Sequence, residues 1–172
     1  MGHEPLCLRV EDAPDPRLAT NARGNLHWSE RRALVEAERD KLMWLLKGKE
    51  LPRFTAPVIV AFKVRLAPVL GRSGRRYQPL LDADALASVC KPWLDALTQG
   101  HRGRGSWEGL GLLVDDSPRC VQRVSYELDP SKGDPYTEIS IEVLIGGAQA
   151  DKEGERGVAV PIPEIERRAK AM

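Results

Sequence analysis

Acidic residues occur in two pairs that are well separated along the chain. Asp82 and Asp84 stand one residue apart, and Asp115 and Asp116 close a short apolar run. Carboxylate oxygens are ligands that Mg²⁺ prefers, and bound Mg²⁺ can activate water and neutralise charge on a phosphodiester. If the first pair lies on an extended segment, its side chains share one face and repel each other unless a cation lies between them. We therefore predict a metal site formed by Asp82, Asp84 and one of the later pair.

Each of these acids also has a simpler interpretation. Aspartate often caps a helix or binds its own backbone in a turn, so Asp82 and Asp84 taken alone are more typical of a turn or a helix cap than of a metal site. Asp115 and Asp116 precede a Ser-Pro dipeptide and could form a turn after a strand. Asp95 is interpreted as an exposed or capping residue rather than a metal ligand.

Positive charge surrounds the first acidic pair. No acid occurs between Lys63 and Leu81, and such a basic segment beside acids favours contact with phosphate over a merely solvated loop. Lys91 could stabilise charge on a phosphate, or it could be a solvated lysine at a helix start. The arginines expected to contact a nucleic-acid backbone are Arg72, Arg75, Arg76, Arg102 and Arg104.

Alternating and helical apolar patterns predict the elements that position these residues. Strands are expected at 6–10, 58–66, 120–128 and 138–145, and a helix capped by Ser29 is expected to run to about Lys47. The last two strands are expected to pair as a hairpin. Apolar residues recur at helical spacing from Leu86 to Leu97, but a proline costs ~3 kcal/mol inside a helix. Because of Pro92, the helix is expected to start near Lys91, with residues 85–90 as a separate turn or kinked lead-in.

Composition sets the class of protein. The chain has 172 residues, 42% hydrophobic and 30% charged, with a net charge of +1, which predicts one domain and excludes a uniformly basic surface. Residues 1–145 are expected to form the domain and 146–172 a charged tail that ends in a short helix, 163–171. We find no apolar stretch long enough for a membrane span and no leader pattern, so we expect a cytosolic protein. Three widely spaced cysteines argue against a disulfide framework and are expected to be ordinary buried thiols.

Two motifs, in this order, resemble those of a known family. DADALASVCKPWLDAL, which begins at Asp82, is followed by GLLVDDSPRCV, which contains Asp115 and Asp116, and then by an alternating strand. They resemble the D-x-D-N-L-x-K-x-x-x-D-A-L and D-D-x-x-V patterns of the RusA-like Holliday junction resolvases, or crossover junction endodeoxyribonucleases, which phages and prophages often carry. The resemblance covers roughly residues 55–145.

The resemblance implies a fold, an activity and a set of site residues. The fold is a small α/β (α+β) domain with a mixed sheet packed against helices, acting as a homodimer on branched DNA. Asp82, Asp84 and Asp116 match the metal-binding aspartates, Lys91 matches the catalytic lysine, and Asp115 is an acidic neighbour. The implied metal is Mg²⁺, with Mn²⁺ also plausible, and the implied location is the cytosol of a bacterium or of a phage-infected host.

The chain departs from the family pattern at two places beside the site. Ala85 stands where the family usually has Asn, and residues 88–90 look like an insertion that moves Lys91 three positions away from the aspartates. If the insertion is helical, it rotates the lysine by about 300°. Two alternatives therefore remain open: a catalytically impaired protein that binds branched DNA through the same fold, and an interaction domain that binds no nucleic acid.

Overall fold

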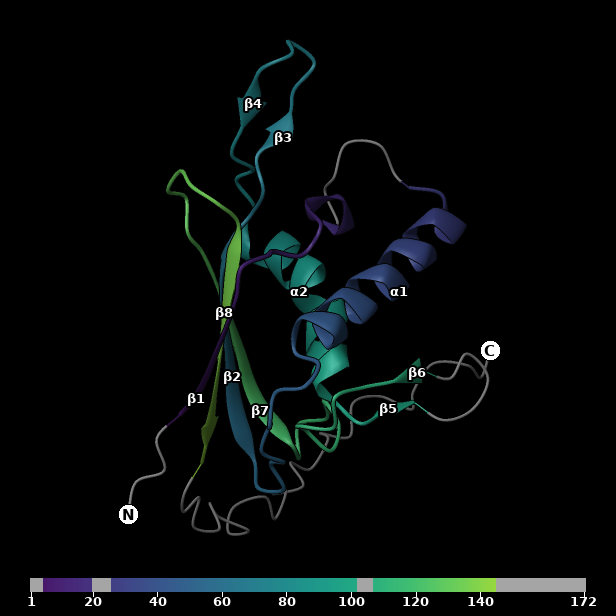
Figure 1. Ribbon diagram of the computed structural model, residues 1–172, viewed down its shortest axis with the longest axis vertical. Coiled ribbons are helices and arrows are strands. Elements are labelled where there is room, and N and C mark those ends of the chain that lie inside the picture. The colour runs from purple at the N-terminus through teal and green to yellow at the C-terminus, as the bar shows by residue number, and fades with distance from the viewer. Residues whose placement is uncertain (1–4, 20–25, 102–106, 145–172) are drawn as a thin grey trace, which may run out of the picture.

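A four-stranded mixed sheet and two helices form the domain in the computed structural model, which describes residues 5–19, 26–101 and 107–144. The sheet contains β1 (Leu6–Val10), β2 (Val58–Arg65), β7 (Val121–Leu128) and β8 (Tyr136–Val143) in the order β1-β8-β2-β7. Helices α1 (Trp28–Leu45) and α2 (Ala83–Leu97) lie on one side of it (Figure 1). This arrangement confirms the predicted small α+β domain with a mixed sheet packed against helices.

Strand β2 is one of the two central strands of the sheet. The inner face of this strand is almost completely buried, with Val58, Val60, Phe62 and Val64 all at most 1% exposed. Pairing on both edges stabilises the strand because it keeps these apolar side chains away from water. It pairs in parallel with β7 and antiparallel with β8. The prediction that the last two strands pair as a hairpin is therefore wrong, because β2 lies between them. The parallel pair needs a long crossover, and α2 provides it.

Helix α2 runs without a break from Ala83 to Leu97. The expectation of a helix that starts near Lys91 is therefore wrong. Val89, Trp93 and Leu97 are fully buried on one stripe, and burying each such side chain stabilises by about 1.5–3 kcal/mol. Their sum exceeds the ~3 kcal/mol that Pro92 costs inside the helix.

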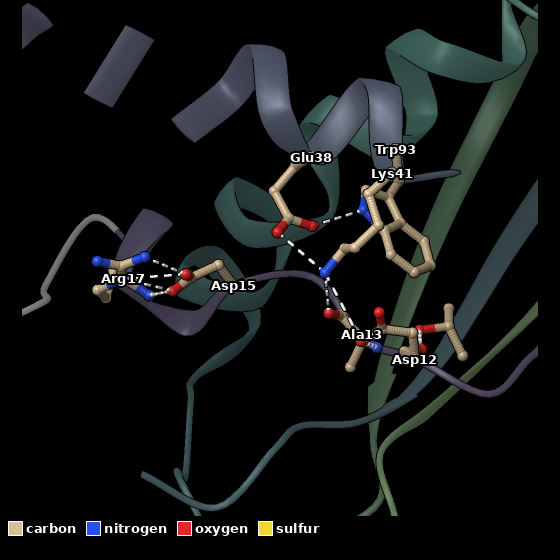
Figure 2. Close-up of polar contacts among 8 residues, drawn as sticks. Asp12, Ala13, Asp15, Arg17, Glu38, Lys41 and Trp93 are labelled. Carbon is tan, nitrogen blue, oxygen red and sulfur yellow. Dashed lines mark hydrogen bonds and ion pairs between the residues drawn. The ribbon is translucent and has the colours of Figure 1, made fainter. Parts of the chain in front are cut away.

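Helix α1 packs on α2 through a buried polar cluster (Figure 2). The Trp93 indole Nε1–H donates to Glu38 Oε2 at 2.9 Å, and Lys41 Nζ lies 3.0 Å from Glu38 Oε1. Lys41 Nζ also donates to the Ala13 carbonyl at 2.8 Å. The cluster thus ties both helices to the segment that follows β1 and contains the 3-10 helix η1 (Pro16–Leu18).

The N-terminus of α1 lies earlier than the sequence predicts. His27, rather than Ser29, is the N-cap, and its backbone N–H donates to the Glu30 carboxylate at 3.1 Å in a capping box. His27 otherwise has no part in the site described below.

Short strands extend the chain outside the main sheet. The basic segment, predicted as a loop, forms a hairpin of β3 (Val69–Leu70) and β4 (Arg76–Tyr77), and β5 (Gly100–His101) pairs with β6 (Trp107–Glu108). No helix in the described part of the chain combines the length and apolarity needed to cross a membrane. The predicted tail, 146–172, lies outside the described residues.

The three cysteines are free thiols, as the spacing predicts. Cys90 is buried in α2, and this burial raises the pKa of its thiol to about 12. Cys7 on β1 is exposed, which differs from the expectation of a buried residue.

Candidate metal and nucleic-acid site

Asp82 and Asp84 lie at the start of α2. Asp82 is the N-cap, and its Oδ1 accepts a hydrogen bond from the Ala85 N–H at 2.8 Å. Asp84 lies in the first helical turn, and both aspartates are exposed. Aspartate is favoured at both positions because it satisfies free N–H groups and interacts well with the helix dipole. The capping interpretation is therefore confirmed for Asp82, and the pair does not share an extended strand.

The later acidic pair is positioned by the last turn of α2. The Leu110 N–H donates to the Ala96 carbonyl at 2.8 Å, and the Leu113 N–H donates to the Leu97 carbonyl at 3.0 Å. These bonds satisfy carbonyls that a helix end leaves without partners. Gly109 allows this close approach, since a Cβ there would lie 2.1 Å from the Thr98 carbonyl oxygen. The turn that carries Asp115 and Asp116 is thereby held beside α2.

Lys91 joins this turn to the helix. Its Nζ lies 2.5 Å from Asp95 Oδ1 and donates a second hydrogen bond to Asp116 Oδ2. Partial burial acts to lower the pKa of Lys91, but the hydrogen bonds that its ammonium donates to Asp116 and Asp95 outweigh the burial, and the pKa is raised. The side chain of Lys91 is 49% exposed. The site therefore holds a stable ammonium at the surface, between two carboxylates.

The spacing along α2 decides where Lys91 lies relative to the first acids. Residues 88–90 are helical, so Asp84 and Lys91 are separated by seven residues, which is about two turns and ~10.5 Å along the axis. Seven residues rotate by about 700°, only ~20° short of two full turns. The insertion therefore returns the lysine to nearly the same side of the helix as Asp84, at a greater distance along it.

The structure does not bring the predicted metal ligands together. Mg²⁺ binds oxygen at about 2.0–2.1 Å, whereas Asp116 meets α2 at Lys91, about two turns beyond Asp84. Within residues 5–19, 26–101 and 107–144, no three His, Cys, Asp or Glu side chains are grouped so that they could hold a metal ion. The donor atoms suit Mg²⁺, but a three-carboxylate site is not preassembled.

Two aspartates differ from their predicted roles. Asp95, interpreted as merely exposed or capping, contacts Lys91, and its i,i+4 spacing from a helical lysine is the signal that could have indicated this. Asp115, predicted beside the metal, accepts a hydrogen bond from the Ser117 N–H at 2.8 Å. Hydrogen bonds from Ser117 also lower the pKa of Asp115. Its carboxylate stabilises its own turn.

The basic hairpin extends from the domain near the start of α2 (Figure 1). Arg72, Arg75 and Arg76 are exposed in it, and Tyr77 beside them is 56% exposed. Only four residues, 78–81, connect the hairpin to Asp82. Exposed arginines next to an exposed aromatic ring suit phosphates and unstacked bases.

Two further cations at the start of the basic segment, Lys63 and Arg65 on β2, do not extend this surface. Lys63 lies 3.3 Å from Glu127, and Arg65 lies 2.7 Å from Asp129, so each is paired with an acid. Arg102 and Arg104 lie outside the described residues. Of the five arginines predicted to contact a nucleic-acid backbone, the three in the hairpin are therefore the ones that the structure describes.

Comparison of the chain with models of known protein families finds no match, and comparison with curated proteins finds none either.

Proposed function

We propose that this protein is a Mg²⁺-dependent endonuclease that hydrolyses phosphodiesters in branched DNA, such as Holliday junctions, during recombination or repair. The contact of Lys91 with Asp116 is the observation that carries the proposal. It holds the later acid beside the helix whose N-terminus bears Asp82 and Asp84, although the two acidic pairs are far apart in the sequence.

Each of the candidate site residues would have its own role in such a reaction. Asp82 and Asp84 offer hard oxygen ligands, and Mg²⁺ or Mn²⁺ is commonly held by one or two carboxylates, waters and the substrate phosphate. When bound, the ion lowers the pKa of the attacking water. Asp116 would approach from its turn once phosphate oxygens compete for Lys91. Lys91, charged at neutral pH, would then face the phosphate and stabilise the charge that develops on it.

The hairpin and a second copy of the chain would position the DNA. Arg72, Arg75 and Arg76 would contact the phosphate backbone beside the first acids, reading shape and charge rather than bases. A four-way junction has two-fold symmetry, so a homodimer with two acidic sites matches symmetric cuts. The proposed location is the cytosol of a bacterial or phage-infected cell, where such DNA occurs.

A second candidate function is binding of branched DNA without cleavage. The observation that favours it is the distance of about two helical turns between Asp84 and the Lys91–Asp116 contact, together with the two carboxylates that already surround Lys91. In this case the hairpin would bind phosphates while the acids only cap and brace α2.

A cleavage assay separates the two functions. A synthetic four-way junction, labelled on one strand, is incubated with Mg²⁺ or Mn²⁺ and the wild type, Asp84→Asn or Asp116→Asn. We expect scission by the wild type, a loss of at least about 10²-fold in both variants, and unchanged junction binding. Asp40→Asn, which removes an exposed carboxylate from α1, is the matched control and should cut at the wild-type rate.

Each contrary result selects an alternative. Tight, salt-sensitive binding by a wild type that makes no cut with either metal favours the second function. Junction binding that is absent, or that ignores salt concentration, argues for an interaction domain that does not bind nucleic acid, because phosphate contacts must weaken as salt rises.

A further inference from the structure

The main sheet has one face that no described helix or strand covers. Helices α1 and α2 lie on the other side of the sheet (Figure 1). Side chains that alternate with the core residues of the strands, including those of Cys7, Arg9, Ser125 and Glu127, are exposed on this open face. Helix α2, which carries the acids at its start, lies on the opposite side of the sheet, so the candidate site does not explain the chemistry of the open face.

Small residues form one row across all four strands of the open face. The strand register places Cys7 opposite Ser140, Ser140 opposite Ala61, and Ala61 opposite Ser125. A hollow of about 680 Å³ lies over this row. Because none of these side chains extends far from the sheet, another flat surface can approach closely here.

The next row on the same face consists only of charged residues with alternating sign. In strand order β1-β8-β2-β7 it reads Arg9, Glu138, Lys63, Glu127. Arg9 lies 2.8 Å from Glu138, and Lys63 lies 3.3 Å from Glu127. The order plus, minus, plus, minus has opposite signs at its two ends and at its two central positions.

That order makes the row complementary to itself under one two-fold rotation. If a second sheet packs face to face through an axis parallel to the strands, between β8 and β2, the row is reversed. Arg9 then faces Glu127 of the other copy, and Lys63 faces the other copy's Glu138. Rotation about an axis that runs along this row, perpendicular to the strands, would instead place each residue over the same residue of the other copy. Like charges would then face each other. The charges therefore select one of the two symmetric arrangements.

We propose that the open sheet face is the interface of a homodimer, with this two-fold axis and with the two rows of small residues in contact. Four strands spaced ~4.8 Å apart, three of them eight residues long and β1 five, give a face of at most roughly 19 by 26 Å. Two such faces bury on the order of 1,000 Å², which is near the lower limit for a specific interface. The charge pairs are partly solvated and fix orientation more than they add affinity. The inference does not depend on DNA cleavage, since an inactive protein could form the same dimer.

Charge reversal tests the arrangement in the full chain. Sedimentation at tens of micromolar is expected to give twice the monomer mass for the wild type. Lys63→Glu and Glu138→Lys should each weaken self-association by more than about tenfold, because like charges then face each other. An equimolar mixture should form dimers again, because Glu at 63 in one copy faces Lys at 138 in the other. A monomeric wild type, variants that associate normally, or a mixture that stays monomeric would overturn the proposal.

A crosslinking experiment leaves the charges unchanged and does not rely on variants that strain the sheet. Cys7 and position 125 lie three strands apart, about 14 Å, within one chain, but face each other across ~10 Å in the proposed dimer. Ser125→Cys, treated with a bis-maleimide of about that reach, should yield covalent dimers on a denaturing gel. Cys7→Ser with Ser125→Cys should not, and Cys120 is present in both. Equal crosslinking of the two variants would refute the interface.

Discussion

At the scale of single residues, the carboxylate of Asp82 has two roles that substitution can separate. Its oxygen caps α2, whereas its charge is the property that a metal ion requires. We predict that Asp82→Ala lowers the free energy of unfolding by ~1 kcal/mol, while Asp82→Asn, which keeps a capping oxygen, stays near the wild type. Urea denaturation measures the stability, and the junction assay measures activity. Both variants should lose cleavage, and an active Asp82→Asn would remove this residue from the metal site.

Lys91 should matter more for cleavage than for stability. Its ion pairs are about half exposed, and such pairs contribute only ~0–1 kcal/mol. We therefore predict that Lys91→Met unfolds at nearly the wild-type urea concentration but cuts junctions about 10²–10³-fold more slowly. Lys132→Met, an exposed lysine between β7 and β8, is the matched control and should change neither quantity. A large loss of stability in Lys91→Met would indicate a purely structural role.

Sequence patterns can indicate residue types more readily than contacts. They indicated Lys91 and Asp116 because both residue types suit phosphate chemistry. In the structure these two side chains form a hydrogen bond. They could not show that Asp95 joins them, since that depends on a helix that continues through Pro92. The metal role of Asp82, Asp84 and Asp116 stays a prediction.

At the scale of elements, the contact between the end of α2 and the following loop depends on Gly109. This glycine is needed for close approach and not for a left-handed backbone conformation. A Cβ at position 109 would lie 2.1 Å from the Thr98 carbonyl oxygen, so Gly109→Ala must push the loop away. We predict a loss of about 1–3 kcal/mol in urea denaturation, the usual cost of overpacking. Gly111→Ala, where a Cβ meets nothing within 4 Å, should cost only the ~1–2 kcal/mol of a left-handed residue.

The hairpin of β3 and β4 should set the salt dependence of DNA binding. Each arginine that contacts a phosphate releases counterions, so the slope of log K against log salt depends on their number. We predict that replacing Arg72, Arg75 and Arg76 with Ala reduces the slope by up to about one unit per residue. Fluorescence anisotropy at several salt concentrations measures it. A slope equal to that of the wild type would show that the hairpin arginines do not contact the DNA phosphates.

The elements themselves were predictable where one local pattern dominates. The alternation of β2 and the apolar stripe of α2 both result from burial on one face, so their type follows from the sequence. The pairing of β7 with β2 could not be found in this way. Strands that are neighbours in sequence usually pair, so the sequence favours a hairpin of β7 and β8. The observed insertion of β2 between them depends on how much surface each strand buries in the folded sheet.

At the scale of the whole molecule, the connection between β7 and β8 should influence acid stability. Hydrogen bonds from Ser131 and Tyr136 hold the pKa of Asp129 well below its usual range, and Arg65 Nη2 donates to the same carboxylate at 2.7 Å. A carboxyl with a lowered folded pKa stabilises the fold above its ordinary pKa, near 3.9, and loses this effect as the pH falls toward the lowered value.

We therefore predict that Asp129→Asn is less stable than the wild type at neutral pH, and that the difference shrinks below about pH 4. Thermal unfolding across pH measures this difference. Asp134→Asn, an exposed carboxylate in the same connection, should follow the wild type at every pH. A difference that stays constant down to strongly acid pH would show that protonation of Asp129 does not control acid unfolding.

The position of β8 between β1 and β2 has a consequence for biosynthesis. Strand β1 leaves the ribosome first, yet its backbone partner is the last strand of the sheet to be made. Until residue 143 has emerged, β1 has no neighbour and one edge of β2 is unprotected, which invites association between nascent chains. A message truncated before β8 would therefore yield an insoluble fragment rather than a smaller working domain.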